Sequence, residues 1–321
     1  KAGHPFFYAI TNPAILFAGN GTESKFKTLD LLPESLVPKS ILFTKNDTLS
    51  ELEKTIKKKR LVFPIIAKPD IGFRGYLVKK INSIQELQSY LRHVKVDVIL
   101  QEFVPYDKEL GIFYHRIPGQ KKGKITSVTI KKFMKIKGDG HLSIAELIEN
   151  DDRAFLYADL FHAIHKNKLE YILNEGEEIT LSVIGNHSKG TQFINGNYLI
   201  NDDLEGLTDK ICHQIKGWYY GRLDIKFNSY DKLLKEKEYK ILEVNGIISE
   251  PTHIYDATHK DASFYQALKS INRHWRIMAK IARKLHREQH IPYPSVRDYL
   301  NNMLWLRSHT QKLKKLNTTN F

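Results

Sequence analysis

Two short segments place carboxylates where they could bind a metal ion or a phosphate. The segment YKILEVNGI (239–247) has the apolar, β-prone character of a strand, yet Glu243 and Asn245 lie in the middle of it. Residues two apart in a strand share one face, so this carboxylate and this amide point the same way. Because a buried polar group is costly unless it is paired or coordinated, the pattern indicates a ligand or partner opposite that face.

The segment GRLDIKF (221–227) supplies a second polar face. Arg222, Asp224 and Lys226 share one side of the expected strand, and apolar residues share the other. The loop that joins the two segments is short enough for them to be antiparallel neighbours with one combined polar surface. Hard oxygen ligands of this kind suit Mg²⁺, which usually takes one or two carboxylates and leaves the remaining positions to phosphate and water. The alternative is a solvated strand face with ordinary cross-strand ion pairs.

A lysine and a glycine loop could supply the phosphate side of such a site. Lys68 ends the apolar run FPIIAKPD (63–70), and a loop with Gly72 and Gly75 follows. A lysine there can reach phosphate oxygens, and backbone N–H groups of the loop can cradle them. A second polar loop bounded by glycines, GNHSKGTQF (185–193), precedes another expected strand. Each feature by itself is also typical of an ordinary surface loop.

The elements that position these residues alternate between strand and helix signals, which predicts a mixed α/β (α+β) fold. Capping-box patterns at Ser83/Glu86 and Ser143/Glu146 mark two helix starts. Asn195–Gly196 predicts the turn of a hairpin. Expected strands cover 63–70, 96–104, 221–227 and 239–245, with two antiparallel strands in 111–136, a hairpin at 191–200, and helices at 83–94, 142–150, 203–219, 261–289 and 295–315.

The helix expected at 261–289 is amphipathic. Its apolar positions are spaced by three or four residues, so they form a stripe that requires a partner surface. The stripe consists of Phe264, Leu268, Ile271, Trp275, Met278, Ile281 and Leu285. We expect this C-terminal region to pack as a helical lid against the rest of the fold. Its basic character leaves a nucleic-acid-binding or partner-binding module as the alternative.

Composition bounds the class of protein. The chain has 321 residues, 41% hydrophobic and 27% charged, as is typical of a globular protein with a real core. The formal net charge is +14, which fits either nucleic acid or a phosphorylated ligand. The basic residues are spread along the chain and no zinc-finger or RNP-like signature occurs, so nucleic acid is not expected as the main partner.

Cysteine content and hydropathy suggest a compartment. Cys212 is the one cysteine, which excludes an intramolecular disulfide and a cysteine metal cluster, and we expect it to be a buried residue on a helix. No apolar run is long enough to span a membrane. No leader pattern opens the sequence, although it starts at Lys1 rather than Met, so an N-terminal piece could precede it. The expected location is the cytoplasm.

In this order, these segments resemble the ATP-grasp superfamily of carboxylate–amine ligases over roughly residues 25–250. The pattern comprises a strand-end lysine with a glycine loop, a QEF segment (101–103) with a downstream glutamate, an R-x-D strand and an E-x-N strand. SKFKTLDLLPESLVPKS (24–40) is similar to a segment of D-alanine–D-alanine ligases. KGDGHLSIAELI (137–148) followed by GNHSKGT is similar to cyanophycin synthetases.

The resemblance implies a role for each matching residue. Asp224, Glu243 and Asn245 would hold two Mg²⁺ ions, and Arg222 would contact the transferred phosphoryl group. Lys68 would bind ATP phosphates and act with Arg222 in catalysis. The nucleotide-binding set would be Lys25, Lys68, Gly72, Arg74, Gly75, Gln101, Glu102, Phe103, Val104, Glu109 and Asn186. Within this set, Gln101 to Val104 would face adenine and Glu109 would bind the ribose hydroxyls. The early lysine that contacts ATP would be either Lys25 or Lys27.

The resemblance also implies a fold and its parts. It implies an ATP-grasp fold with two α+β lobes whose antiparallel sheets grip ATP, followed by a C-terminal helical segment. The expected parts are an N-terminal segment 1–50, a small lobe with the phosphate loop 51–115, a large lobe with the metal site 116–255, and a helical extension 256–321. The N-terminal substrate domain of these ligases is expected to be missing or reduced, since about 25 residues precede the resemblance.

Departures from the family pattern point to a different substrate. The phosphate loop DIGFRG lacks the serine-rich form of D-alanine ligases, and GIISEPTHIYD (246–256) replaces their Thr-x-Pro-Gly pattern. Glu250, His253 and Tyr255 are therefore candidate substrate contacts, with Asp256 beside them. His187, in the candidate active-site loop 185–193, is a further candidate.

The implied reaction uses ATP and Mg²⁺ to activate a small-molecule or peptide carboxylate as an acyl phosphate and to join it to an amine. Catalysis of this kind is mainly positioning and electrostatic stabilisation. An ATP-binding or kinase-like protein that forms no amide is the alternative. The acid, the amine and the oligomeric state are not indicated by the sequence.

Overall fold

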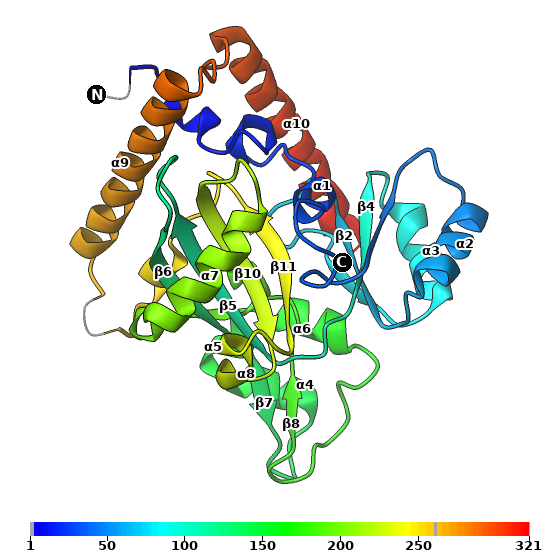
Figure 1. Cartoon of the computed structure of the whole chain (residues 1–321). Coiled ribbons are helices and arrows are strands. Elements are labelled where there is room, and N and C mark those ends of the chain that lie inside the picture. Colours follow the sequence, from blue (N-terminus) through cyan, green and yellow to red (C-terminus); the bar gives the residue numbers. More distant parts are fainter. Residues whose placement is uncertain (1–2, 260–261, 321) are drawn as a thin grey trace.

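The computed structural model describes residues 3–259 and 262–320, and these contain two larger antiparallel sheets flanked by helices and one two-stranded sheet (Figure 1). The first sheet has the order β1-β4-β2-β3. Its strands are β1 (Ser40–Phe43), β2 (Ile65–Pro69), β3 (Lys79–Ile81) and β4 (Val98–Glu102). Helices α2 (Leu49–Lys59) and α3 (Ile84–His93) pack beside it through a core that includes Leu52, Leu87 and Leu100. This sheet carries Lys68 on β2 and Gln101 on β4.

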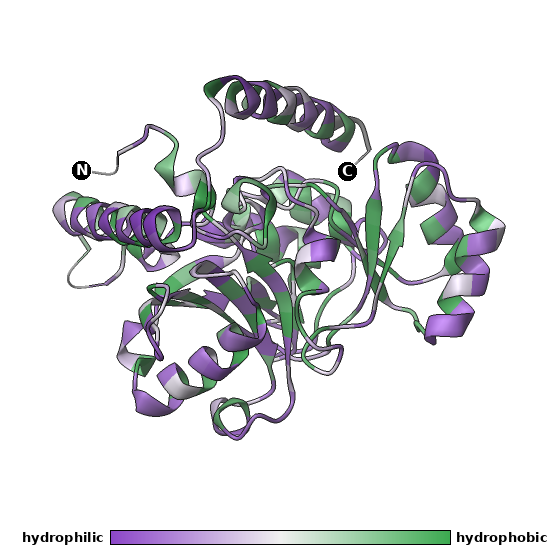
Figure 2. Cartoon of the chain, turned by 45° about the horizontal axis from the view of Figure 1, so that its top comes forward, coloured by the Kyte–Doolittle hydropathy of each residue, from purple (hydrophilic) through white to green (hydrophobic). Residues whose placement is uncertain are grey.

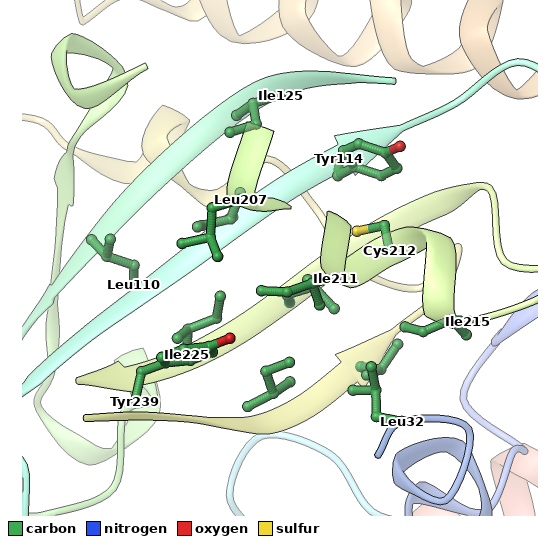
Figure 3. Packing of buried hydrophobic residues seen from close by; sticks show 14 of the residues in the cluster. Leu32, Leu110, Tyr114, Ile125, Leu207, Ile211, Cys212, Ile215, Ile225 and Tyr239 are labelled. Atoms are coloured by element: carbon green, nitrogen blue, oxygen red, sulfur yellow. The ribbon is translucent and has the colours of Figure 1, made fainter. Parts of the chain in front are cut away.

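The second sheet is larger and carries the polar strands. Its order is β11-β10-β5-β6-β9, and every neighbouring pair is antiparallel. The strands are β5 (Lys108–His115), β6 (Lys124–Lys132), β9 (Gln192–Asn195), β10 (Tyr220–Phe227) and β11 (Tyr239–Asn245). Helix α7 (Asp202–Gln214) packs on the apolar face, where Ile211 and Cys212 lie in one cluster with Ile225 and Tyr239 (Figure 3). The short helix α8 (Tyr230–Leu234) lies in the loop between β10 and β11.

A third, smaller unit follows β6. It consists of the paired strands β7 (Lys135–Lys137) and β8 (Glu178–Thr180) and of helices α4 (Ile144–Asn150), α5 (Asp152–Phe155) and α6 (Ala158–His165). Its own core is centred on Ile148, Phe161 and Leu181. Short elements complete the chain: α1 (Lys25–Leu29) and the 3-10 helices η1 (Phe7–Ile10), η2 (Leu16–Ala18), η3 (His187–Lys189), η4 (Asn197–Leu199) and η5 (Thr252–Tyr255).

Two long helices lie on the outside of the sheets, and most of their residues are hydrophilic (Figure 2). Helix α9 (Phe264–Glu288) packs on the end of β5 and β10 through Met278, Ile281 and Leu285. Helix α10 (Val296–Asn320) crosses to the first sheet, where Leu313 enters the core of that sheet. No helix in the described residues is long and apolar enough to cross a membrane.

Most expected elements are confirmed, including the antiparallel pair 221–227 and 239–245 and the buried Cys212 on a helix. The capping box at Ser143/Glu146 forms in both directions. At the other predicted box, Ser83 accepts a hydrogen bond from the backbone N–H of Glu86, but the Glu86 carboxylate accepts from the backbone N–H of Asn82 instead. The helix expected at 203–219 ends at Gln214, before Gly217, whose φ is +79°.

Two expectations are wrong. Residues 191–200 form no hairpin, because Gly196 donates its backbone N–H to Val128 and Asn197 accepts from Val128, so β9 pairs with β6 and η4 follows. The local Asn-Gly signal is overridden by this tertiary pairing. In α9 the stripe is buried only in its second half, since Phe264 is 80% exposed.

Candidate nucleotide and metal site

A cleft of about 820 Å³ is lined by residues of both sheets, the loop 72–75 and α10. Its floor is the polar face of β10 and β11. Arg222 stands opposite Asn245 in the strand register, and Asp224 stands opposite Glu243. Side chains at directly opposed positions of an antiparallel pair lie side by side on one face, so the four groups form one surface.

Asp224 is held from two sides. Its carboxylate accepts hydrogen bonds from Arg222 Nε at 2.8 Å and Nη2 at 3.1 Å, and Lys131 Nζ lies 3.3 Å from its Oδ2. Gly111 of β5 lies beside this pair, and a Cβ there would lie 3.1 Å from Arg222 Cδ. A glycine at this position therefore leaves the room that the guanidinium occupies.

Glu243 lies between two lysines from different parts of the chain. Lys25 of α1 forms a short ion pair with it, and Lys68 Nζ lies 3.4 Å from the backbone oxygen of Leu242. Burial alone would raise the pKa of Glu243, but Lys25 and Lys68 outweigh it and hold this pKa well below its ordinary value. Glu243 is therefore ionised across the physiological range.

The basic side chains of the cleft respond to burial in opposite ways. Burial alone would lower the pKa of Lys25 and of Lys131, but neighbouring carboxylates raise both. At Lys68 burial prevails, and its pKa is lowered. The Lys226 pKa is lowered by burial as well, so these two ammonium groups are incompletely compensated, as expected of groups that meet an additional anion on binding.

The loop 72–75 lines the same cleft. Arg74 and Gly75 adopt positive φ values of 51° and 66°, which turn the loop sharply. Ser188 Oγ lies within hydrogen-bond distance of two acceptors, the backbone oxygen of Arg74 at 2.7 Å and Asn186 Oδ1 at 2.9 Å. The two glycine-bounded loops of the sequence are therefore joined directly.

The segment 101–104 borders the same cleft. Gln101 Oε1 accepts a hydrogen bond from Lys68 Nζ at 3.1 Å. The Phe103 ring lies 4.4 Å from Lys80 Nζ and 5.3 Å from Lys226 Nζ, measured to the ring centroid. With the apolar lining residues Ile66, Val183 and Leu242, this end offers a flat, apolar slot next to basic groups.

The donor set suits Mg²⁺. Asp224, Glu243 and Asn245 provide two carboxylates and an amide at adjacent register positions, and Mg²⁺ in proteins usually takes one or two carboxylates together with phosphate oxygens. Asn245 Nδ2 is buried without a hydrogen-bond partner among the described residues, as expected for an amide that meets its partner in a ligand-bound state. No group of three or more His, Cys, Asp or Glu side chains that could hold a metal ion occurs in the described residues.

Most of the predicted site residues line this one cleft. They are Lys25, Lys68, Gly72, Arg74, Gly75, Gln101, Glu102, Phe103, Val104, Glu109, Asn186, Arg222, Asp224, Glu243, Asn245, Glu250 and Tyr255.

Four candidates lie elsewhere. Between the two early lysines, Lys25 lines the cleft, whereas Lys27 is exposed on α1 and does not. His187 is exposed and packs against the Phe193 ring, with 5.5 Å between ring centroids. His253 and Asp256 line a different cleft, beside α9.

Sequence reasoning missed three contributors. Lys131 of β6 is 5% exposed and bridges Glu109 and Asp224. The sequence pattern that could have indicated Lys131 is its position in the strand segment VTIKK (128–132). Lys226 was expected on the polar face but was not assigned to the site. Lys314 of α10 lines the cleft from a helix some 70 residues past β11, beyond the reach of any local pattern.

No protein-family model and no curated protein sequence matches the chain. The fold is similar to solved ligase structures. The VanG D-Ala:D-Ser ligase of Enterococcus faecalis is 15% identical with a TM-score of 0.44, and the match covers 82% of this chain and 61% of that one. The D-alanine–D-alanine ligase of Bacillus anthracis, solved also as a complex with ATP, is 12% identical in one structure with a TM-score of 0.44, covering 83% of this chain and 68% of that one.

A bifunctional glutathione synthetase of Pasteurella multocida matches at 15% identity and a TM-score of 0.40, over 80% of this chain and 38% of that one. This chain thus spans about three fifths of the length of the D-Ala:D-Ser ligase.

Proposed function

We propose that this protein is an ATP- and Mg²⁺-dependent ligase that activates a carboxylate as an acyl phosphate and joins it to an amine, with release of ADP and phosphate. The observation that carries the proposal is the pairing of Asp224 with Glu243 across β10 and β11, facing Lys25 and Lys68 within one cleft. Two carboxylates for a divalent cation beside lysines for phosphates form the combination that phosphoryl transfer from a nucleotide requires.

The nucleotide would lie along the cleft from the slot at Phe103 to the floor at Arg222. Its base would occupy the slot beside the backbone of 101–104, and its phosphates would lie between Lys68 and the loop 72–75. Basic side chains outnumber acidic ones among the lining residues, which compensates a polyphosphate.

Mg²⁺ held by Asp224, Glu243 and Asn245 would neutralise charge on the phosphates. Arg222, already fixed by its two hydrogen bonds to Asp224, would stabilise charge that develops on the transferred phosphoryl group. Because both partners lie on one strand face, the guanidinium is held in place before substrate binds. This preorganisation is the main contribution of protein side chains to such a reaction.

In the first step, a carboxylate oxygen of the substrate attacks the γ-phosphorus of ATP, the bond from that phosphorus to the β,γ-bridging oxygen breaks, and ADP leaves. In the second step, the nitrogen of the amine attacks the acyl carbon, the carbon–oxygen bond to phosphate breaks, and the nitrogen loses a proton. No protein nucleophile is required, and the buried Cys212 belongs to the core of the second sheet.

A screen for release of ADP and phosphate, with pools of acids and amines in the presence of Mg²⁺, tests the proposal. Wild-type protein should turn over ATP only with a matching acid. Glu243→Gln should reduce turnover by about 10²–10³-fold, the order expected for loss of a main transition-state charge contact.

Glu236→Gln is the matched control, because Glu236 pairs with the exposed Lys210 away from the cleft. Full turnover by Glu243→Gln would exclude the metal assignment. Phosphorylation of an acid without amide formation would instead identify a kinase-like protein.

A further inference from the structure

A second cleft of about 1120 Å³ lies between α9 and the β6/β9 edge of the second sheet. One wall is the first part of α9, and the other includes Thr126 of β6, Asn195 of β9 and His253 of η5. This cleft is separate from the nucleotide cleft, and none of the roles assigned above uses it.

The α9 wall is strongly basic. Lys269, Arg273, Arg276 and Lys280 line the cleft, and their spacings of four, three and four residues put them on one helix face. All four are exposed, and none of them forms an ion pair with a described residue. On the same helix, by contrast, Lys284 lies 3.6 Å from Glu288.

The opposite wall offers almost no compensation for this charge. Asp256 is the single acidic side chain among the described residues that line the cleft. Its carboxylate is 5% exposed and accepts hydrogen bonds from the backbone N–H groups of Asn195 at 2.8 Å and Thr258 at 3.0 Å. The hydrogen bonds of the Asp256 carboxylate are therefore made to backbone N–H groups of its own wall.

The positive charges on α9 contribute to lowered pKa values of two nearby histidines. Burial lowers the pKa of His115 to about 4, and the charges of Arg273, Lys124 and Lys280 contribute. Burial likewise lowers the pKa of His274 to about 3, assisted by His115 and Arg273. Both histidines are thus neutral at physiological pH, and they add no charge to the cleft.

The two clefts share a wall. Thr252 and Tyr255 of η5 line the nucleotide cleft, whereas His253 and Ile254 of the same turn line the basic cleft. Hydrogen bonds fix this turn on β6: Thr252 Oγ1 donates to Thr129 Oγ1 at 2.9 Å, and Ser127 Oγ lies 2.7 Å from His253 Nδ1. A ligand in the basic cleft would therefore be separated from the nucleotide cleft by this turn.

We propose that the basic cleft binds the substrate of the ligase and that this substrate is a short peptide with several carboxylates. The proposal rests on the proposed function, because a ligase of this class consumes a carboxylate next to its nucleotide cleft. Nucleic acid would match the charge but would present no carboxylate for activation.

The dimensions agree with a short chain. From Lys269 to Lys280 the helix rises about 16 Å at 1.5 Å per residue. An extended peptide covers that length with about five residues. Alternate side chains of such a peptide recur about every 7 Å, close to the roughly 5–6 Å between neighbouring basic positions on the helix face.

Binding of a fluorescently labelled penta-glutamate, measured by anisotropy without ATP, tests the proposal independently of turnover. The double variant Arg273→Gln/Arg276→Gln should weaken binding at least tenfold. The matched control is Arg283→Gln/Arg287→Gln, which removes the same charge from exposed positions of α9 that do not line the cleft. It should bind as wild type does.

The outcomes distinguish a peptide-binding cleft from a nucleic-acid-binding cleft and from failure of the ligase function. Equal weakening by both double variants, or no binding of penta-glutamate, would overturn the proposal. Tighter binding of a five-nucleotide single strand that is lost in Arg273→Gln/Arg276→Gln would overturn it in favour of nucleic acid. Site-specific peptide binding without ATP turnover on any acid would support the anionic peptide site while the ligase function fails. When turnover is present, the cleft variant should raise KM for the peptide and leave kcat within twofold.

Discussion

Lys131 Nζ lies 2.5 Å from Glu109 Oε1 in the middle of the polar sheet face, and both side chains are only 4% exposed. The same ammonium lies 3.3 Å from Asp224 Oδ2, so one lysine compensates two buried carboxylates on neighbouring strands. Removal of one member of a buried charge network leaves an uncompensated charge, which is much more costly than replacing the whole network.

We therefore expect Lys131→Met to lower the free energy of unfolding by about 3–5 kcal/mol. Urea denaturation measures it. The double variant Lys131→Met/Glu109→Gln should recover part of the loss, because it removes a charge that has lost its partner. A double variant that is less stable than the sum of the two single effects would contradict the network.

Gly221 of β10 lies in close contact with the backbone of Asn245 on β11. Its φ is +151°, and a Cβ there would lie 1.9 Å from the backbone oxygen of Asn245. Gly221→Ala should therefore separate β10 from β11, with a loss of more than about 3 kcal/mol in unfolding free energy and of nucleotide binding. Gly206 in α7 is the matched control, since nothing lies within 4 Å of a Cβ there. Gly206→Ala should stabilise by about 0.5–1 kcal/mol.

Helix α10 packs against the first sheet. Leu313 is fully buried in the core of that sheet, and His309 Nε2 lies 2.9 Å from the backbone oxygen of Ile71. Leu313→Ala should lower the free energy of unfolding by about 2–5 kcal/mol, as for other buried leucines. Leu304→Ala, at a position that is 65% exposed on the same helix, should change it by less than about 0.5 kcal/mol. Similar effects of both substitutions on thermal unfolding would mean that α10 is not docked in this way.

Stability should depend on pH through the histidines beneath α9. The pKa of His115 is about 4 in the folded protein against an ordinary value of 6.5, so between these values the unfolded chain binds more protons. The free energy of unfolding must then fall as pH falls from 6.5 to 4, and the contribution is fully present above 6.5.

At about 1.4 kcal/mol per pKa unit, His115 contributes a change of about 3 kcal/mol over this range. Denaturation series at several pH values should show this slope, and His115→Gln should reduce it. His141→Gln, at an exposed position, should leave it unchanged. A slope that persists in His115→Gln would assign the dependence to other groups, of which His274 is the first to test.

The sequence by itself determined the local parts of the site. Alternation of apolar and polar residues put Asp224 on the same face as Arg222, and Glu243 on the same face as Asn245, because side chains alternate across a strand. The short loop between the strands then fixed their antiparallel pairing. The same periodicity placed Lys68 at a strand end and Cys212 in a buried helix face.

Only the tertiary structure decided what meets across these elements. Lys25 rather than Lys27 faces Glu243, because the packing of α1 sets which side of that one-turn helix turns inward. Contacts between segments far apart in the chain place Lys131 and Lys314 in the nucleotide cleft and His253 outside it. The Asn195–Gly196 hairpin failed for the same reason: pairing with β6 satisfies backbone groups that the local turn would have left to solvent. Local pattern sets the face of a side chain, whereas burial and long-range pairing set its partner.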